Sequence, residues 1–226
     1  MKKILFAMSL ICCSVLASGA EILMEMNRQG TISLPQGQIL GFNGIGLDRF
    51  VGYSFNGRDS LFWFETLEGD QAQKNYTLAM TFAVHKKPEG RDFMPLFFRT
   101  GRHNYLAVQP NGALVFAVWY LKMDGKNGQI KITTPKTIRI GKGRLERAAV
   151  TCETLPENRL RVKFWYNGGL VGEQTVEGKG FVEYKKNIYL GCSPENVKGF
   201  VPLDGVLQTV QLFNEVLPDE EIIALR

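Results

Sequence analysis

Histidine is scarce in this chain, since His85 and His103 are the only two among 226 residues. Neither belongs to a pair spaced four residues apart, as a zinc-binding helix requires, or to a recognisable nucleophile motif. The sequence also lacks a Gly-x-Gly-x-x-Gly segment and a P-loop. The residues therefore give no support for a metallohydrolase, for a hydrolase with a catalytic triad or for a nucleotide-dependent enzyme.

Cysteine is almost as scarce, and two of the four cysteines stand near the N-terminus. Cys12 and Cys13 lie inside an uncharged run that follows two lysines and precedes small residues at 17–20. This order is typical of a secretory signal peptide. We expect 1–20 to be removed, and an exported protein, periplasmic or extracellular, in a bacterium. The apolar run is shorter than the roughly 20 residues that a bilayer core requires, so no transmembrane segment is expected after cleavage.

The other two cysteines, Cys152 and Cys192, would be the only pair in the mature chain. In an oxidising compartment they could form one disulfide. They could equally be two separate buried thiols, because a bridge needs Cα atoms within about 7 Å and sequence spacing does not show that.

Long charge runs of one sign are absent. The formal net charge of +5 would fall to +3 once the two lysines of the leader are lost. The basic residues are scattered rather than arranged along one face, so no nucleic-acid partner is expected.

No long segment has helical periodicity. Instead, short runs rich in β-branched and aromatic residues alternate with Gly, Asn, Asp and Pro, which indicates an all-β sandwich or barrel. The expected strands are 22–26, 31–34, 50–55, 60–65, 76–85, 94–99, 105–109, 113–121, 129–133, 147–153, 159–166, 170–176, 187–192 and 207–213. With no linker or repeat, 21–226 is expected to be one domain.

Two hairpin turns and one helix are chemically distinct. Asn167-Gly168 and Pro110-Asn111-Gly112 each separate two apolar runs, and Asn-Gly tolerates the positive φ angles of tight turns. At the C-terminus, Pro218 precedes three acidic residues and an apolar run. Acids in a first turn favour a helix N-terminus, so a short helix is expected there.

Several segments follow one another in an informative order. They are Val-Gly-Tyr-Ser-Phe-Asn-Gly at 51–57, the strand at 76–83, Phe-Trp-Tyr-Asn-Gly at 164–168, Ile-Tyr-Leu-Gly at 188–191, and the closing strand and helix at 203–222. In this order they resemble the laminin G-like, concanavalin A-like jelly-roll family. The chain departs from the family near 145–151, where a Trp-His pattern is usual. The resemblance implies a two-sheet antiparallel jelly-roll sandwich, with its sheets about 10 Å apart, and a short C-terminal helix.

The glucanases of the wider superfamily use a Glu-x-Asp-x-Glu strand, which this chain lacks. In the nearest segment, Glu21 and Glu25 flank Leu23 instead of Asp. In a regular strand these carboxylates would stand about 13 Å apart, beyond the ~9.5 Å of inverting glycosidases. The enzymes close that gap with a bulge, which we do not expect here. The segment Glu65-Thr-Leu-Glu68 has the wrong spacing, so we expect no enzyme activity.

Sugar-binding members of such folds hold ligands with aromatic faces and polar side chains. The aromatic candidates are Trp63, Trp119, Tyr120 and Trp165, with the alternative that each fills the core. Since side chains alternate across a strand, one member of each pair Trp119/Tyr120 and Phe164/Trp165 should face inward. The loop candidates are Arg99, Arg102, His103 and Asn104, with a solvated hairpin as the alternative.

Calcium is a further expectation of the resemblance, because many laminin G-like domains bind it at the sheet rim with carboxylate, amide and carbonyl oxygens. The candidate ligands are Asp48, Asn56, Asp59, Asp124 and Asp204, which otherwise are ordinary turn residues. The sequence as a whole predicts an exported, non-catalytic module that binds carbohydrate on a rim or concave face. The alternatives are an adhesion module for a protein partner or cell-surface ligand, and a divergent glycan hydrolase.

Overall fold

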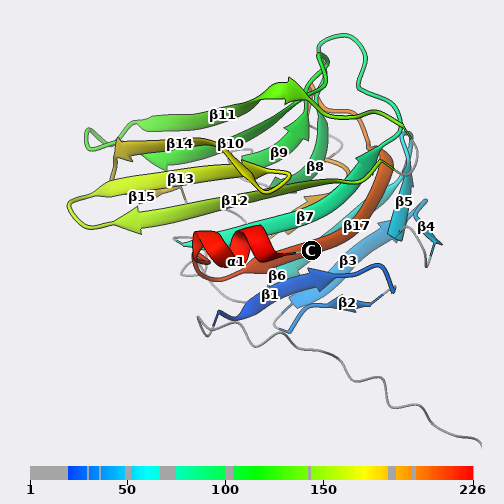
Figure 1. Cartoon of the computed structure of the whole chain (residues 1–226), viewed down its shortest axis with the longest axis horizontal. Coiled ribbons are helices and arrows are strands. Elements are labelled where there is room, and N and C mark those ends of the chain that lie inside the picture. Colours follow the sequence, from blue (N-terminus) through cyan, green and yellow to red (C-terminus); the bar gives the residue numbers. More distant parts are fainter. Residues whose placement is uncertain are drawn as a thin grey trace, which may run out of the picture.

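We describe a computed structural model that covers residues 20–29, 31–35, 37–48, 52–66, 75–99, 104–141, 144–182, 187–194 and 197–225. These residues form two antiparallel β-sheets packed face to face, and one short helix, α1 (Asp219–Ala224) (Figure 1). The expected all-β sandwich with a C-terminal helix is confirmed. The expected leader, up to residue 19, lies outside the described residues. No helix in the described ranges is long and apolar enough to span a bilayer.

The first sheet has nine strands. In spatial order these are β14 (Gly169–Glu177), β13 (Arg159–Tyr166), β12 (Glu146–Leu155), β7 (Tyr76–Val84), β17 (Asp204–Phe213), β1 (Ile22–Met26) and β2 (Ile32–Ser33), with β5 (Gly52–Asn56) also on β17 and β4 (Gly46–Asp48) on β5.

The second sheet has eight strands. In spatial order these are β11 (Asn127–Thr137), β10 (Ala113–Leu121), β9 (Asn104–Val108), β8 (Met94–Arg99), β16 (Asn187–Leu190), β6 (Leu61–Thr66) and β3 (Gly37–Asn43), with β15 (Gly180–Phe181) also on β10. Strands β3, β4 and β15 were not predicted, and β11 is longer than predicted.

The two Asn-Gly turns form as expected. Asn167 and Gly168 have φ angles of 51° and 82° and connect β13 to β14. Gly112, with a φ of 85°, follows Asn111 in the turn between β9 and β10. Both hairpins therefore rest on residues that accept the left-handed backbone region.

Phenylalanine rings fill the space between the sheets. Phe62, Phe64, Phe82, Phe116 and Phe164 are fully buried in one apolar cluster that takes side chains from both sheets. Each ring removes a large apolar area from water, and this burial is the main free-energy gain of the fold.

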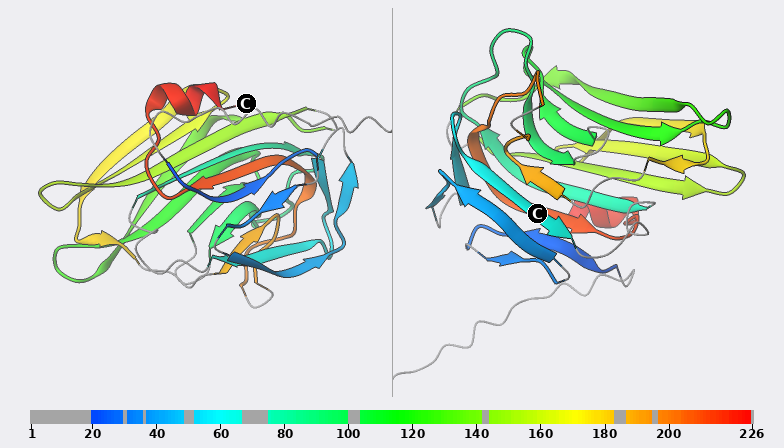
Figure 2. Two further views of the ribbon diagram at one scale, coloured as in Figure 1. Left: turned by 90° about the horizontal axis from the view of Figure 1, so that it is seen from below. Right: turned by 180° about the vertical axis from the view of Figure 1, so that it is seen from behind.

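The C-terminal helix covers part of the outer face of the nine-stranded sheet, as the two views in Figure 2 show. Its Ile222 packs with Trp165 and Leu217 in a second apolar cluster. Lys163 Nζ donates to the carboxylate of Asp219 at 2.8 and 2.9 Å, which fastens the first turn of the helix to β13. Trp165 is only 3% exposed. Phe164 and Trp165 thus point to opposite faces as predicted, yet both are buried.

Replacing Trp165 with Ala should lower the free energy of unfolding by about 3–5 kcal/mol, because the indole is buried against α1. The matched control is Leu170→Ala in β14, where the side chain is 51% exposed and the change should stay within about 0.5 kcal/mol. Urea unfolding followed by circular dichroism measures both. Equal stabilities for the two variants would contradict the burial of Trp165 beneath the helix.

Candidate functional site

A row of aromatic residues crosses the outer face of the eight-stranded sheet. The paired residues are Trp63 and Tyr189, Tyr189 and Phe98, and Phe98 and Tyr105, contributed by β6, β16, β8 and β9. Each ring has at least one strand neighbour in the main core, whereas Phe98 and Tyr105 belong to a separate cluster, so alternation directs these rings outward. The sandwich thus carries an aromatic row on the face opposite the core.

One end of this row is covered. Phe200 meets the rings of Phe98 and Tyr105 edge-on, with centroids 5.1 and 5.2 Å away. Phe93 holds the covering segment in place, because its N–H donates to Gly199 O and its carbonyl accepts from Val201 N, both at 2.8 Å. Phe98 and Tyr105 are therefore buried, at 0% and 9% exposure.

The other end of the row is open. The rings of Trp63 and Tyr189 stack with centroids 5.5 Å apart and planes 5° from parallel, and both side chains are partly exposed. Gly41 faces Trp63 across β3 and β6. A Cβ atom on Gly41 would lie 1.9 Å from the indole Nε1, so only glycine lets the indole take this position.

The stacked pair lines a pocket of about 620 Å³, which we call the aromatic pocket. Its lining consists of Asn43, Arg58, Asp59, Ser60, Leu61, Trp63, Tyr189, Cys192, Ser193, Pro194 and Pro202. An apolar platform surrounded by a few amide, carboxylate, hydroxyl and guanidinium groups is the usual composition of a small-molecule site.

One turn supplies the polar side of the aromatic pocket. Asn56 Oδ1 accepts the backbone N–H groups of Arg58, Asp59 and Ser60 at 2.9, 3.2 and 3.3 Å. Ser60 Oγ donates to Gly44 O at 2.7 Å, which ties the turn to the preceding loop. An Asn side chain that mimics backbone hydrogen bonding in this way holds a turn in one conformation, so the backbone of Arg58 and Asp59 is fixed.

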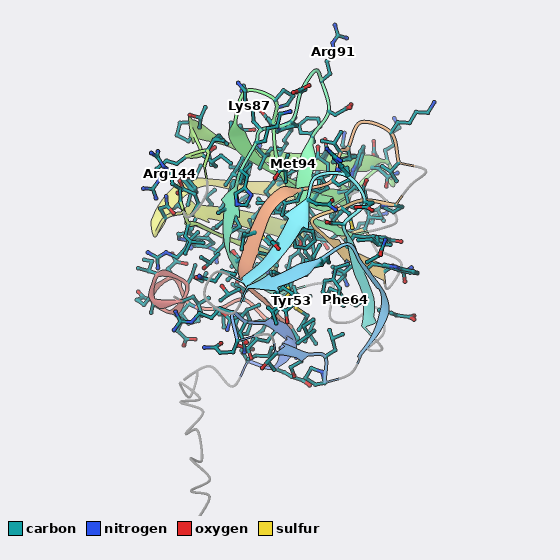
Figure 3. All side chains as sticks on the ribbon, turned by 90° about the vertical axis from the view of Figure 1, so that its right-hand side faces the viewer. Tyr53, Phe64, Lys87, Arg91, Met94 and Arg144 are labelled. Carbon is teal, nitrogen blue, oxygen red and sulfur yellow. The ribbon has the colours of Figure 1, made fainter. Side chains whose placement is uncertain are left out.

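A second pocket, of about 350 Å³, adjoins the first, and we call it the basic pocket. Its lining consists of Asn56, Gly57, Arg58, Lys86, Lys87, Pro88, Glu89, Met94, Val201, Pro202 and Asp204. Lys86 Nζ lies 2.8 Å from Glu89 Oε1, and His85 Nδ1 lies 3.5 Å from Asp204 Oδ1. Figure 3 views this end of the sandwich and shows Lys87 and Met94 on it.

A sequence profile described as the concanavalin A-like lectin/glucanases superfamily matches residues 64–223. The chain belongs to this superfamily. The match covers most of the chain and confirms the family that the segments in "Sequence analysis" resemble. A search of curated protein sequences found no match.

Several solved structures share the fold of this superfamily member. The binding domain of botulinum neurotoxin serotype D has a TM-score of 0.66 and 11% identity, and that of serotype G has 0.67 and 9%. The serotype D ligand binding domain in complex with N-acetylneuraminic acid has 0.66 and 12%. Each comparison covers 90% of this chain and 50% of the other, so the chain spans half the length of these domains. At these identities the likeness shows the fold alone.

Of the four aromatic candidates, the structure places only Trp63 in the aromatic pocket. Trp119 lies on the same sheet, but β10 is four strands from β6, roughly 19 Å at about 4.8 Å per strand. Tyr120 packs against the main core, so the predicted alternation with Trp119 is confirmed. Trp165 lies under α1 in an apolar cluster, which agrees with the alternative that it fills the core.

Two of the four loop candidates lie in strands and not in a loop, so that part of the prediction is wrong. Arg99 is 3% exposed and Asn104 is fully buried. They pair with each other as the last residue of β8 and the first of β9. Asn104 Oδ1 accepts the backbone N–H of Trp119 at 3.0 Å, which is a structural role. Arg102 and His103 lie outside the described residues.

The candidate calcium ligands whose side chains are described do not gather into one donor set. Asn56 and Asp204 face each other on β5 and β17, but Asn56 Oδ1 is occupied by three N–H groups, and Asp59 Oδ1 accepts from Asn56 Nδ2 at 2.5 Å. Asp124 Oδ1 accepts the N–H of Lys126 in a distant hairpin. The side chain of Asp48 lies outside the described part. Within the described ranges no three His, Cys, Asp or Glu side chains gather as a metal site would require.

The two carboxylates of the segment nearest to the glucanase pattern have structural partners. Glu21 accepts from Asn214 Nδ2 at 3.2 Å and Glu25 from Gln211 Nε2 at 3.3 Å. Strand β1 does contain a register irregularity, between Ile22 and Met24. The expectation of a regular strand was therefore wrong. Glu68, of the second candidate pair, lies outside the described residues.

Four residues that line the aromatic pocket were not among the candidates from the sequence: Tyr189, Arg58, Asn43 and Ser193. Tyr189 had a detectable signal, because it alternates with Ile188 and Leu190 in an otherwise apolar strand. Arg58 had a weaker one as a cation inside an Asn-Gly turn. For Asn43 and Ser193 we find no local signal, since only the fold brings their segments beside Trp63.

The two described cysteines are free thiols, so the structure shows separate buried thiols rather than the disulfide considered above. Cys152 lies inside the main core, and Cys192 Sγ donates to Phe62 O at 3.7 Å. Burial raises the pKa of Cys152 from 9.0 to about 12 and that of Cys192 to about 11. Both thiols are therefore neutral in the folded protein at physiological pH.

The thiols should make stability fall in alkaline solution. Between pH 9 and about 11 the unfolded chain releases thiol protons that the folded chain retains, so unfolding becomes more favourable by up to about 1.4 kcal/mol per pH unit per thiol. Urea unfolding from pH 8 to 10.5 under reducing conditions measures this slope. In Cys152→Ala/Cys192→Ala the slope should be smaller, and an unchanged slope would show that the thiols ionise equally in both states.

Proposed function

We propose that this protein is an exported, non-catalytic binding module for carbohydrate, and that the aromatic pocket is its binding site. The observation that carries the proposal is the partly exposed stack of Trp63 and Tyr189. The apolar face of a pyranose ring can pack on such aromatic faces, while its hydroxyls need polar partners around the edge. Asn43, Asp59 and Ser193 stand in the lining and offer those partners.

The size of the aromatic pocket supports the proposal. Ligand pockets commonly measure about 300–1,000 Å³, and this one has about 620 Å³. The indole rests against Gly41 and the tyrosine stacks on the indole, so the platform exists before any ligand arrives. A preformed site orders fewer side chains on binding, which lowers the free-energy cost of association.

The carboxylates of the pocket favour binding over hydrolysis. Glycosidases of the common type use two carboxyl groups that flank the scissile bond. Among the described residues that line the aromatic pocket, Asp59 is the one carboxylate, and it accepts a hydrogen bond from Asn56. The described lining of the aromatic pocket thus does not contain both a carboxyl proton donor and a carboxylate nucleophile. The superfamily includes glucanases as well as lectins, so hydrolysis is an outcome that the binding test must also record.

The comparisons are compatible with a binding role. The neurotoxin structures are described as binding domains, and one was solved with N-acetylneuraminic acid. Because the chain spans half of those domains, their ligand does not identify the one bound here. The alternative ligand is a protein on the cell surface. In that case the protein would bind no glycan on an array.

Replacing Trp63 with Ala should weaken glycan binding at least tenfold, which corresponds to about 1.4 kcal/mol, because the platform for the sugar ring is lost. A glycan array with residues 21–226 identifies the ligand, and titration calorimetry then measures affinity. Release of reducing sugar is followed in the same samples.

Two further variants show whether a loss of affinity is specific to the aromatic pocket. Trp119→Ala removes an indole from the same sheet outside the pocket, and should leave affinity within twofold. Gly41→Ala retains Trp63 but forces the indole from its position, so affinity should fall as in Trp63→Ala. If neither Trp63→Ala nor Gly41→Ala affects the affinity of a glycan bound by the wild type, the site lies elsewhere. No glycan binding, or turnover, would refute the proposed function.

Export is supported by the pattern of residues 1–20, a basic start followed by an apolar run and small residues. Protein recovered from cells that synthesise the whole chain should therefore begin at Glu21 and be found outside the cytoplasm. Fractionation and intact-mass measurement check this. A cytoplasmic protein that retains residues 1–20 would exclude export.

A further inference from the structure

The two pockets adjoin each other, because both are lined by Arg58 and Pro202, and we call them together the groove. The groove runs from the stacked rings of Trp63 and Tyr189 to the loop that follows β7, where Lys86 and Lys87 lie. Its two ends differ in chemistry, since the first is an aromatic platform and the second is rich in cations. A ligand that fills both would need an uncharged ring at one end and a polar group at the other.

The charges of the basic pocket do not cancel. Arg58, Lys86 and Lys87 face Glu89 and Asp204. Glu89 is engaged by Lys86, and Asp204 lies beside His85. Arg58 and Lys87 form no ion pair with any described residue. The three cations therefore exceed the two carboxylates by one positive charge, and Arg58 and Lys87 are the cations without an ion-pair partner.

Arg58 stands where it can serve both ends. Its backbone N–H donates to Asn56 Oδ1, and the neighbouring Gly57 N–H donates to Leu203 O at 2.9 Å. The turn is therefore held from two directions. A guanidinium offers paired N–H donors that match the two oxygens of a carboxylate or sulfate, and a fixed backbone reduces the entropy lost on binding.

We propose that the groove binds an oligosaccharide that carries an anionic group. One sugar ring packs on Trp63 and Tyr189, and the anion of an adjacent ring lies against Arg58 and Lys87. The inference rests on the proposed function, because it extends the same site by one anionic subsite. Carboxylate and sulfate groups share the required chemistry.

The test is a glycan array in which each acidic oligosaccharide stands beside its neutral counterpart. One arm pairs uronic acid oligosaccharides with their methyl esters, and the other pairs sulfated with desulfated oligosaccharides. Wild-type protein should bind at least one acidic form tenfold more tightly than its neutral partner. Arg58→Gln/Lys87→Gln should lose that preference while its affinity for the neutral form stays within about twofold.

The matched control is Arg91→Gln/Arg144→Gln, which removes the same charge from the same end of the molecule. Both residues are exposed and line neither pocket, and Figure 3 shows Arg91 projecting outward from its loop and Arg144 at the other side of this end. The preference should survive in this variant. Equal loss in both double variants would mean that net charge, not the groove, attracts the ligand.

The outcomes separate the two proposals. Binding of neutral and acidic partners with equal affinity would overturn the anionic subsite and leave carbohydrate binding intact. Failure to bind any glycan would overturn both. A preference in only the carboxylate arm or only the sulfate arm supports the subsite and identifies its anion.

Discussion

The packing of the two sheets against each other is the constraint on which the rest of the structure depends. Rings such as Phe62, Phe64 and Phe164 are fully buried between the sheets. Because side chains alternate along a strand, this packing decides which residues face outward. Trp63 points outward because Phe62 and Phe64, on either side of it, enter the core. Tyr189 points outward for the same reason, between Ile188 and Leu190.

Outward-facing aromatic residues expose apolar area to water unless something covers them. The residues discussed above lie in three different environments. Trp165 is covered by the C-terminal helix. Phe98 and Tyr105 are covered by Phe93 and Phe200. Trp63 and Tyr189 cover each other in part and leave the remainder open. Exposed apolar patches with a polar rim often mark binding sites. Because the neighbouring rings of the row are covered, the open pair of Trp63 and Tyr189 is the part of the row that fits this description.

Local patterns predicted the fold well and the site only in part. Asn167-Gly168 forms a hairpin because two adjacent residues accept positive φ angles. This signal is local, so the sequence alone shows it. Strands β3 and β4 were missed because glycine and polar residues interrupt their alternation. The burial of Trp165 stayed open because its cover, α1, comes from a distant segment. Arg99 and Asn104 were expected in a loop because they are polar, but they pair with each other as the ends of β8 and β9. Tyr189 meets Trp63 only through the order of strands in the sheet, which no local pattern encodes.

Two local features position the residues of the proposed groove. The indole of Trp63 depends on the missing side chain of Gly41, and the backbone of Arg58 depends on the amide of Asn56. Neither Gly41 nor Asn56 belongs to the apolar core between the sheets. The residues that position the platform and the turn are therefore not the ones that fill the space between the sheets. Such a division is consistent with one sandwich fold presenting different surfaces to different ligands.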